Sequence, residues 1–308
     1  MNKILITGVN GFVGNYLYNE FCIFNEVYGL DIMPNLKIKN MLVCDITNIL
    51  QLNEIIKNLD FDIVIHCAAL AHNDKNLIKS EEFYRVNVLG TNNLINSLSS
   101  KNISQFYFLS TISVYGESGY SISISEEMPI TPKTDYAKSK FEAEKLVISS
   151  NFRQYFILRM PVIHSSKFLK DILKRIFIFN LMRINFIFKP GSGKQIHSFC
   201  HIKNLSFTLL NLFKHQNIDS DTFNIADSYN YTTNDIVEYI RKSKKKMTIV
   251  IAIPKQLVII FLYLNSLITN KKHDYKSIFW KLYMNNIYST EKIRKLDIKL
   301  DYTILKSQ

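Results

Sequence analysis

The sequence predicts an α/β protein with a doubly wound parallel sheet and a smaller C-terminal lobe. Three observations lead to this fold class. Short apolar segments typical of buried strands alternate with amphipathic helical segments as far as Arg159, a glycine-rich turn joins the first strand to the first helix, and the alternation fades after Pro161. Strands that alternate with helices lie parallel in one sheet with helices on both faces, so the N-terminal part should hold the sheet.

The N-terminal segments follow one another in a regular order. Strands are expected at Lys3–Thr7, Glu26–Asp31, Met41–Cys44, Asp62–Cys67, Gln105–Leu109 and Gln154–Arg159. Helices are expected at Gly11–Phe24, Asn48–Asn58, Lys79–Ser100 and about Thr134–Ser150. Each helix joins two neighbouring strands, which is the pattern of a doubly wound sheet.

The C-terminal part has a weaker pattern. Residues 165–195 are apolar and basic without a clean period, whereas Ser198–Ile202 and Thr222–Ala226 look like strands that flank a helix. We expect one domain at residues 1–164, completed by about 198–228, and a smaller lobe formed by 165–197 and 229–308. The sequence contains no internal repeat and no Pro- or Ser-rich linker that would separate independent domains.

Composition indicates a globular chain with a basic excess. Of the 308 residues 47 % are hydrophobic, and 38 Lys and Arg against 26 Asp and Glu give a net charge of +12. Such an excess of positive charge could favour binding to nucleic acid, to a membrane surface or to an acidic substrate. The basic residues are mostly scattered, so we interpret the excess mainly as compositional; the one cluster is Lys242, Lys244, Lys245 and Lys246. No expected helix has a basic face interleaved with aromatic residues, so nucleic-acid binding is not expected.

Two apolar stretches, Ile176–Phe188 and Thr248–Ile268, are interrupted by polar or charged residues. They fall short of the roughly 20 unbroken apolar residues of an integral membrane span. We expect both stretches to pack in the core or at a subunit interface, with peripheral membrane contact as the alternative. The first apolar run, which ends at Thr7, is too short for a signal peptide, so a cytoplasmic location is expected.

Cysteine and histidine spacing gives no sign of disulfides or metal. Cys22, Cys44, Cys67 and Cys200 are far apart and form no Cys-x-x-Cys pair, so four reduced, buried thiols are expected. His197 and His201 are four residues apart on an expected strand rather than a helix, so they do not share a face and no metal site is expected.

The turn after the first strand has the glycine spacing of a dinucleotide-binding loop. Gly8, Gly11 and Gly14 stand between a buried strand and an amphipathic helix. Glycine there permits a tight turn, lets backbone N–H groups approach a pyrophosphate and lets helix and sheet pack closely. We therefore expect a Rossmann-type fold whose loop binds the cofactor, with these further loop residues taking part: Asn10, Phe12 and Val13.

Asp31 favours NAD over NADP. It ends the second expected strand, where a carboxylate receives the hydroxyls of the adenosine ribose and repels a 2′-phosphate. The next two residues are Ile32 and Met33, whereas a protein that binds the 2′-phosphate of NADP would need an arginine there. Lys37 and Lys39 keep NADP as an alternative, because lysine can also meet a phosphate.

Tyr136 and Lys140 form a candidate acid/base pair. They lie four residues apart on an expected helix and so share a face. A phenol has an unperturbed pKa of roughly 10. A neighbouring ammonium and a nicotinamide cation both favour the phenolate, which makes Tyr136 a usable acid/base. Ser110 and Thr111 lie just beyond the strand that ends at Leu109, where a hydroxyl could orient a substrate oxygen.

The chain resembles the extended short-chain dehydrogenase/reductase family, within its NAD-dependent epimerase/dehydratase branch, nearly from end to end. The segments that carry the resemblance are Thr7–Gly14, Asp31, Asp45 with Ile46, His66–Ala69, Asn87–Thr91, Ser110–Gly116, Tyr136 with Lys140, and Leu158–Pro161. Their order and spacing together are specific, although each alone is weak.

The resemblance implies a role for each matching residue. Asp45 and Ile46 would lie beside the adenine, and Lys140 would also hold the nicotinamide ribose. Thr111 would orient the substrate together with Tyr136. Further cofactor-binding positions implied by the family are Ala68, Ala69, Asn87, Ser110 and Pro161.

The family also implies a substrate, a nucleotide-diphosphate sugar, and a homodimer. His197 stands where related sequences usually have an arginine that binds the diphosphate, so that contact is in question, and Lys194 could compensate. A substrate-binding role is still expected at this position.

The reaction is less specified than the fold. Related 4,6-dehydratases carry an acidic pair directly after the catalytic threonine, and Ile112 and Ser113 stand there instead, so dehydration is disfavoured. We expect an NAD-dependent 4-epimerase that acts on a UDP-hexose or UDP-N-acetylhexosamine through a 4-keto intermediate, for surface-polysaccharide synthesis. One alternative is an NAD(P)H-dependent reductase of a UDP-4-keto-6-deoxy sugar. The other is a catalytically silent dinucleotide-binding regulator.

Overall fold

The computed structural model describes residues 1–71, 79–116, 123–165, 177–181, 184–215, 218–243, 247–260 and 282–303. The chain divides into two compact units. The first consists of Met1–Gly116, Pro129–Met160 and Ser206–Asn224, and the second of Glu117–Met128, Pro161–Leu205 and Ile225–Gln308. The domain boundaries expected from the sequence stay predictions.

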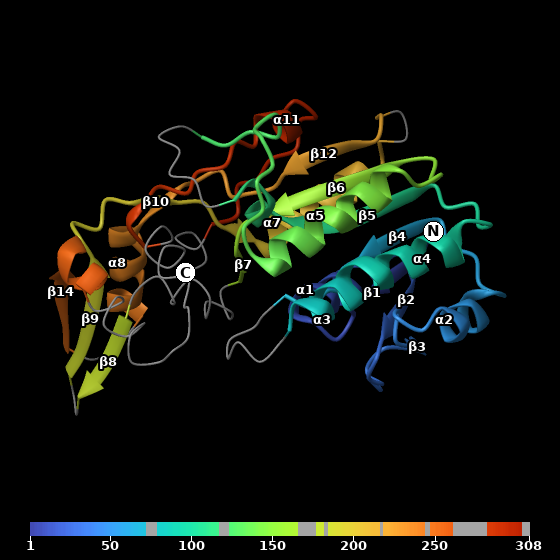
Figure 1. Cartoon of the computed structure of the whole chain (residues 1–308), viewed down its shortest axis with the longest axis horizontal. Coiled ribbons are helices and arrows are strands. Elements are labelled where there is room, and N and C mark those ends of the chain that lie inside the picture. The colour runs from blue at the N-terminus through green and yellow to red at the C-terminus, as the bar shows by residue number, and fades with distance from the viewer. Residues whose placement is uncertain are drawn as a thin grey trace. The chain divides into compact units, whose positions relative to one another are not determined.

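The first unit is built on a seven-stranded sheet in the order β12-β6-β5-β4-β1-β2-β3 (Figure 1). All neighbouring strands are parallel. The strand order reverses between β1 and β4, which is where doubly wound sheets bind dinucleotides, so the expected fold class is confirmed. The strands are β1 Lys3–Thr7, β2 Glu26–Asp31, β3 Asn40–Val43, β4 Ile63–His66, β5 Gln105–Thr111, β6 Tyr155–Met160 and β12 Asp221–Asn224.

The helices begin and end close to the expected residues. Thr134 caps α5 by accepting a hydrogen bond from the backbone N–H of Ala137, and Asn48 caps α2 in the same way. The expected helix Lys79–Ser100 contains a π-helical turn, η1, between α3 and α4. The elements are α1 Phe12–Phe21, α2 Ile49–Ile56, α3 Ser80–Tyr84, η1 Arg85–Leu89, α4 Gly90–Leu98, the 3₁₀ helix η2 Ile112–Tyr115, α5 Asp135–Ile148 and α7 Ile202–Leu212.

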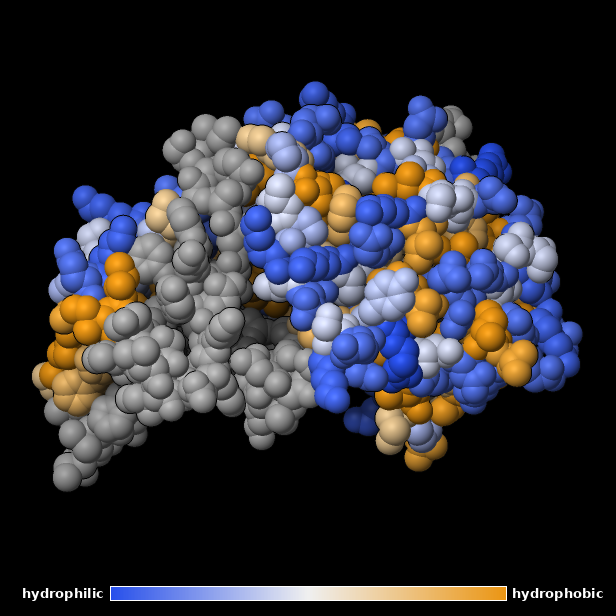
Figure 2. All heavy atoms as spheres, in the orientation of Figure 1, coloured by the Kyte–Doolittle hydropathy of each residue, from blue (hydrophilic) through white to orange (hydrophobic). Residues whose placement is uncertain are grey.

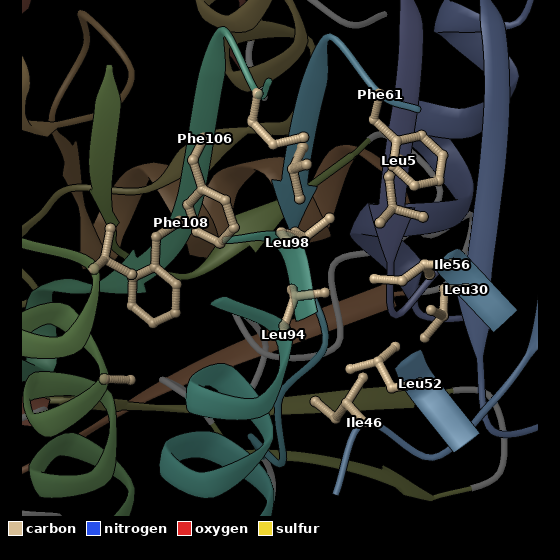
Figure 3. Packing of buried hydrophobic residues seen from close by; sticks show 14 of the residues in the cluster. Leu5, Leu30, Ile46, Leu52, Ile56, Phe61, Leu94, Leu98, Phe106 and Phe108 are labelled. Atoms are coloured by element: carbon tan, nitrogen blue, oxygen red, sulfur yellow. The ribbon is translucent and has the colours of Figure 1, made fainter. Parts of the chain in front are cut away.

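Successive residues of β5 pack against opposite sides of the sheet. Phe106 and Phe108 belong to a buried cluster that also holds Leu52 of α2 and Leu94 of α4 (Figure 3). Tyr107, between them, instead contacts Phe213, with 5.4 Å between ring centroids. This alternation is the period of two that a strand imposes on its side chains.

The second unit contains a three-stranded sheet and two strand pairs. In the sheet, β9 lies between β8, which is antiparallel to it, and β14, which is parallel. Helix α8 packs on a buried cluster that includes Ile187, Phe199 and Tyr231. The elements are β7 Ile163–His164, β8 Phe177–Leu181, β9 Ile184–Pro190, β10 Ile196–His197, β11 Cys200–His201, β13 Tyr231–Thr232, α8 Thr233–Ser243, β14 Met247–Ile253 and α11 Glu291–Arg294.

Three sequence expectations need correction in this part of the chain. The strand expected at Ser198–Ile202 is present but shorter than expected, because β11 spans only Cys200–His201 and Ile202 already begins α7. Residues 248–268 were expected to pack in the core or at a subunit interface, and the core part of this expectation is wrong for the described residues, because 250, 251, 257, 259 and 260 are exposed apolar residues. Packing at a subunit interface stays a prediction. Cys22 is exposed and Cys67 partly exposed, so the four thiols are not all buried.

No helix within the described residues is long and apolar enough to cross a membrane. The expected cytoplasmic location stays a prediction.

Candidate active site

The glycine loop between β1 and α1 leaves no room for side chains at two positions. Gly8 has a φ of +69°, and a Cβ there would lie 2.7 Å from the backbone of Ala68. A Cβ at Gly14 would overlap the carbonyl oxygen of Gly8. Gly11 stands at the N-cap of α1, where no side-chain cap bonds to the helix. Backbone amides at a helix N-terminus of this kind can meet an anion.

Asp31 is held against this loop. Its Oδ2 accepts a hydrogen bond from the backbone N–H of Asn10 at 3.0 Å, and the side chain of Asn10 donates to the carbonyl of Met33 at 2.7 Å. The carboxylate therefore lies at the carboxyl end of β2, beside the turn that the three glycines form. Lys37 and Lys39, which the NADP alternative would use, are exposed.

Asp45 and Ile46 follow β3. The carboxylate of Asp45 accepts a hydrogen bond from the backbone N–H of Thr47 at 2.9 Å, which fixes the turn. Ile46 is buried, and its side chain fills the space over Gly90, where an added Cβ would lie 2.7 Å from it. Gly90 thus allows α4 to approach this loop closely.

Asn87, in the π-helical turn, connects the loop after β4 to the helix that carries Tyr136. Its amide accepts from the backbone N–H of Leu70 at 2.7 Å and donates to the Leu70 carbonyl at 3.0 Å, which fixes the segment that includes Ala68 and Ala69. It also donates to Ser139 Oγ at 2.9 Å, and Ser139 donates to the carbonyl of Tyr136 at 2.9 Å.

His66 occupies the middle of a buried hydrogen-bond chain. Thr91 Oγ1 donates to the carbonyl of Asn87 at 2.6 Å, so its contact with His66 Nε2 at 2.9 Å makes that nitrogen the donor. His66 Nδ1 then accepts from Thr7 Oγ1 at 2.6 Å, and Thr7 Oγ1 accepts from the backbone N–H of Ala68 at 3.2 Å. Burial, assisted by the nearby Lys140 cation, lowers the pKa of His66 to about 3, so the ring is neutral.

Thr111, Tyr136 and Lys140 meet at the carboxyl end of β5. Thr111 ends this strand, and its hydroxyl donates to Ser113 Oγ at 3.3 Å and accepts from the backbone N–H of Ser113 at 3.2 Å. The Thr111 side chain also lies close enough to Tyr136 to lower the pKa of its phenol. Burial has the larger effect and raises the pKa of Tyr136 to about 12. Lys140 lies one turn further along α5, is 2 % exposed, and has its Nζ 3.8 Å from the centroid of the Phe108 ring.

Burial also acts on Lys140. It lowers the pKa of this ammonium to about 7, although the negative charge of Glu144 opposes the shift. A lysine with this pKa is only partly charged at neutral pH, so it favours the Tyr136 phenolate less than the sequence suggests, and the protein alone leaves the pKa of Tyr136 raised. Burial disfavours both the phenolate of Tyr136 and the ammonium of Lys140. The positive charge of an oxidised nicotinamide would favour the phenolate.

A buried ion pair lies behind these residues. Ser110 Oγ donates to Glu144 Oε1 at 2.5 Å, and Arg159 donates to both carboxylate oxygens, at 3.1 and 2.7 Å. Arg159 also donates to the Tyr115 hydroxyl at 3.0 Å, which donates to Asn224 at 2.8 Å. Tyr115 is fully buried, so it packs rather than facing a substrate.

Sequence reasoning missed Glu144, Ser139 and Thr91 as parts of this site. One signal was available for Glu144. It stands four residues after Lys140 and so on the same face of α5, and a carboxylate on a buried helix face needs a cationic partner.

Pro161 and His197 belong to the second unit, whereas the other expected site residues belong to the first. Pro161 follows β6 and is buried. His197 is 1 % exposed and its Nε2 lies 3.1 Å from Thr233 Oγ1. Lys194, the residue considered as a substitute for diphosphate binding, is exposed.

Comparison with known proteins gives one family. Residues 4–226 match the model of the NAD dependent epimerase/dehydratase family. A UDP-glucose 4-epimerase from Vibrio cholerae is 24 % identical over 266 residues, which cover 82 % of this chain and 79 % of that protein. A dTDP-D-glucose 4,6-dehydratase from Dictyostelium discoideum is 32 % identical over 190 residues, 53 % of this chain and 42 % of that protein.

The aligned part spans about half the length, or less, of the dTDP-D-glucose 4,6-dehydratases that the chain matches. Among solved structures, a UDP-glucuronic acid 4-epimerase from Bacillus cereus in complex with NAD has a TM-score of 0.70 at 18 % identity and covers 98 % of this chain and 94 % of its own. A dTDP-4-dehydrorhamnose reductase from Bacillus anthracis in complex with NADP has a TM-score of 0.66 at 21 % identity, with 83 % and 85 % covered. These structures have the same fold.

Proposed function

Because this chain belongs to the NAD-dependent epimerase/dehydratase family, we propose that it is an NAD-dependent 4-epimerase of a nucleotide-diphosphate sugar, acting through a 4-keto intermediate. The observation that carries the proposal is the position of Thr111, at the carboxyl end of β5 and close enough to Tyr136 to act on the pKa of its phenol, with the buried Lys140 one turn further along α5. A hydroxyl and a phenol that lie this close can share one substrate oxygen, which is what oxidation and reduction at a single carbon require.

The residues of the first unit fit NAD. The glycines at 8 and 14 stand where any Cβ would collide with backbone, and no side chain caps α1, so a pyrophosphate can approach these amides. Asp31 would accept the hydroxyls of the adenosine ribose, and a 2′-phosphate beside its carboxylate would be repelled. Asp45 and Ile46 would flank the adenine, and Lys140 would bind the nicotinamide ribose.

Proton transfer falls to Tyr136. When bound, the nicotinamide ring supplies reversible hydride transfer at C4 of the sugar. Thr111 orients the C4 oxygen, and Tyr136 removes the hydroxyl proton and later returns it. With a pKa of about 12 the phenol is protonated at neutral pH, so its action as a base depends on the cationic form of the cofactor.

Dehydration is not part of the proposal, although several relatives are dehydratases. Elimination of water needs an acid and a base beside the Tyr136 centre. Ile112 and Ser113 follow Thr111 in the 3₁₀ helix, and neither side chain is an acid.

A second candidate is one-way reduction of a nucleotide-linked 4-keto sugar with NAD(P)H. The raised pKa of Tyr136 favours it, because a protonated phenol is the form that donates to a carbonyl oxygen during reduction. A catalytically silent regulator is the remaining alternative, and it would need neither Tyr136 nor Lys140.

The decisive experiment combines cofactor identification with three substrates. Purified protein is denatured and the released nucleotide identified; native protein is incubated with UDP-glucose, UDP-N-acetylglucosamine and a UDP-4-keto-6-deoxy sugar. Retained NAD with interconversion of the C4 epimers is the expected result. Net consumption of NAD(P)H with the keto sugar alone would assign the reductase instead.

Tyr136→Phe is the matched variant for this experiment. It removes only the phenol hydroxyl and should lower kcat by about 10²–10⁴-fold while the protein still binds NAD. Full sugar-converting activity in this variant would overturn the catalytic assignment of Tyr136. NAD binding without conversion of any of the three substrates by either protein would support the regulator.

A further inference from the structure

An exposed apolar surface covers β14 and the residues that follow it. Figure 2 shows apolar atoms gathered over this part of the second unit. The surface, called here the β14 surface, consists of Met247, Val250, Ile251, Leu257, Ile259 and Ile260, which are 36 % to 68 % exposed. Val250 and Ile251 are successive strand residues and lie on opposite faces of β14, so the surface wraps around this edge strand. Scattered exposed apolar residues are ordinary, but a group of this size within 14 residues marks an interaction site.

The side chains of the β14 surface are of the kind that contacts lipid acyl chains. The six side chains are aliphatic or thioether groups with no aromatic residue among them, and the exposed Lys255 and Gln256 lie between them. Protein–protein interfaces usually contain Tyr, Trp or Arg at their centre. An aliphatic surface with a lysine beside it fits the acyl chains and headgroups of lipids better than it fits a folded protein.

Charge beside the β14 surface points to an anionic partner. Arg241 and Lys242, in the last turn of α8, are 62 % and 65 % exposed, and their contacts with Glu238 are long, at 3.7 and 3.9 Å. Lys255, which follows the strand, is also exposed. The composition agrees, because residues 161–308 hold 24 of the 38 Lys and Arg but 10 of the 26 Asp and Glu.

We propose that the β14 surface docks on an anionic phospholipid membrane, with its apolar side chains at the level of the headgroups and its basic residues on the lipid phosphates. Apolar burial together with electrostatic attraction is the combination by which peripheral proteins bind such membranes. A second copy of the chain fits less well, because two such faces would bring like charges together. The membrane would then hold the enzyme on its surface.

Vesicle binding by the full-length protein tests the proposal. The protein is mixed with sedimentable vesicles of phosphatidylcholine alone, or of phosphatidylcholine with phosphatidylglycerol, at low and at high NaCl concentration. We expect sedimentation only with the anionic vesicles, and release at high salt, since ionic screening weakens the attraction. Protein that stays in the supernatant with anionic vesicles at low salt overturns the proposal.

Two pairs of variants locate the surface. The double variant Arg241→Gln/Lys242→Gln should weaken vesicle binding about tenfold or more. Lys57→Gln/Lys145→Gln is its matched control, because both lysines are 53 % exposed and pair with a glutamate three residues away in the first unit. For the apolar part, Leu257→Gln/Ile260→Gln should also weaken binding, whereas Ile23→Gln/Phe24→Gln, which changes two exposed residues of the first unit, should not.

The alternatives give different results. If Leu257→Gln/Ile260→Gln turns a dimer into a monomer, by light scattering, but leaves vesicle binding unchanged, the surface contacts a second copy and the membrane proposal is wrong. Equal loss of binding in the control and test pairs would mean that only overall charge matters, which also overturns it. Matching circular dichroism spectra establish that each variant is folded, and conversion of the sugar substrates should be unaffected in all of them.

Discussion

Ser110 donates a 2.5 Å hydrogen bond to Glu144, and this bond ties the end of β5 to the helix that carries Tyr136. The same carboxylate accepts two hydrogen bonds from Arg159. Ser110, Glu144 and Arg159 are each 5 % exposed or less. Because Thr111 directly follows Ser110, the buried pair fixes the position of the hydroxyl that the proposed mechanism uses.

Replacement of Glu144 by Gln should strongly destabilise the protein. The change leaves the guanidinium of Arg159 buried without its anion, and removal of one partner from a buried ion pair typically lowers the free energy of unfolding by about 3–5 kcal/mol. Urea unfolding followed by circular dichroism measures the loss. A loss below about 1 kcal/mol would mean that the pair contributes little.

The double variant Glu144→Met/Arg159→Met is the control for this prediction. It removes both charges and keeps similar volume, so it should recover most of the stability that Glu144→Gln loses. If it is as unstable as the single variant, the loss comes from packing or from the Ser110 hydrogen bond rather than from the unpaired charge.

His66 should make the protein less stable in mild acid. Its pKa is about 3 in the folded chain, whereas an unperturbed histidine has a pKa of roughly 6.5. Between these values the unfolded chain takes up a proton that the folded chain does not, so stability falls as the pH drops below roughly 6.5, by up to about 1.4 kcal/mol per pH unit. Urea unfolding at pH 7.5 and pH 5 measures the drop.

The variant His66→Asn removes the pH dependence of stability that comes from this histidine. His66→Asn should be less stable than the wild type at pH 7.5, because the hydrogen bonds to Thr7 and Thr91 are lost, but its stability should fall less between pH 7.5 and pH 5. His201 has its pKa lowered to about 4, mainly by burial, so His201→Asn should also reduce the drop. The same pH dependence in His66→Asn as in the wild type would contradict a neutral, buried His66.

Lys140 should weaken the folded state at neutral pH in the absence of cofactor. Burial lowers its pKa to about 7, against 10.5 for a free lysine, so below pH 7 folding buries a charge. As the pH rises from 7 towards 10.5, the folded chain loses this proton before the unfolded chain does, and stability increases. Lys140→Met should therefore raise the midpoint of thermal unfolding at pH 6, and the gain should shrink by pH 9.

The Lys140→Met variant should also lose activity. Lys140→Met should lower kcat by about 10²-fold or more, because the ribose contact and the cation near Tyr136 are both lost. Lys138→Met changes an exposed lysine on the same helix and should alter neither property. A stability gain that is the same at pH 6 and pH 9 would show that packing, not charge, separates Lys140→Met from the wild type.

Local sequence patterns predicted the places of the glycine loop and of Tyr136 with Lys140 in the fold, whereas the roles of these residues stay predictions. In both cases the relevant spacing lies within one turn or one helix, and the backbone fixes where these residues point. The bonds from Ser110 to Glu144 and from Asn87 to Ser139 join residues 34 and 52 positions apart, which only the tertiary fold brings together. No periodicity within one element could have predicted them.

The second unit was less predictable for a related reason. Hydropathy predicted that residues 248–268 lie in the core or at a subunit interface, and in this chain Ile251 and Leu257 are 39 % and 57 % exposed. An apolar residue is not necessarily buried, because the packing of neighbouring elements decides which strand edge or face is covered.

Gly14→Ala should abolish NAD binding or destabilise the first unit, although it adds only one methyl group. That methyl would overlap the carbonyl oxygen of Gly8, and this contact is with backbone, so either the loop or the start of α1 must move. Gly11→Ala is the matched control, because its Cβ would lie 3.2 Å from the same oxygen and the backbone φ of −69° suits alanine. Calorimetric titration with NAD should give a much larger rise in Kd for Gly14→Ala than for Gly11→Ala. Equal affinity in the two variants would mean that the close approach of α1 to the loop is not what NAD binding requires.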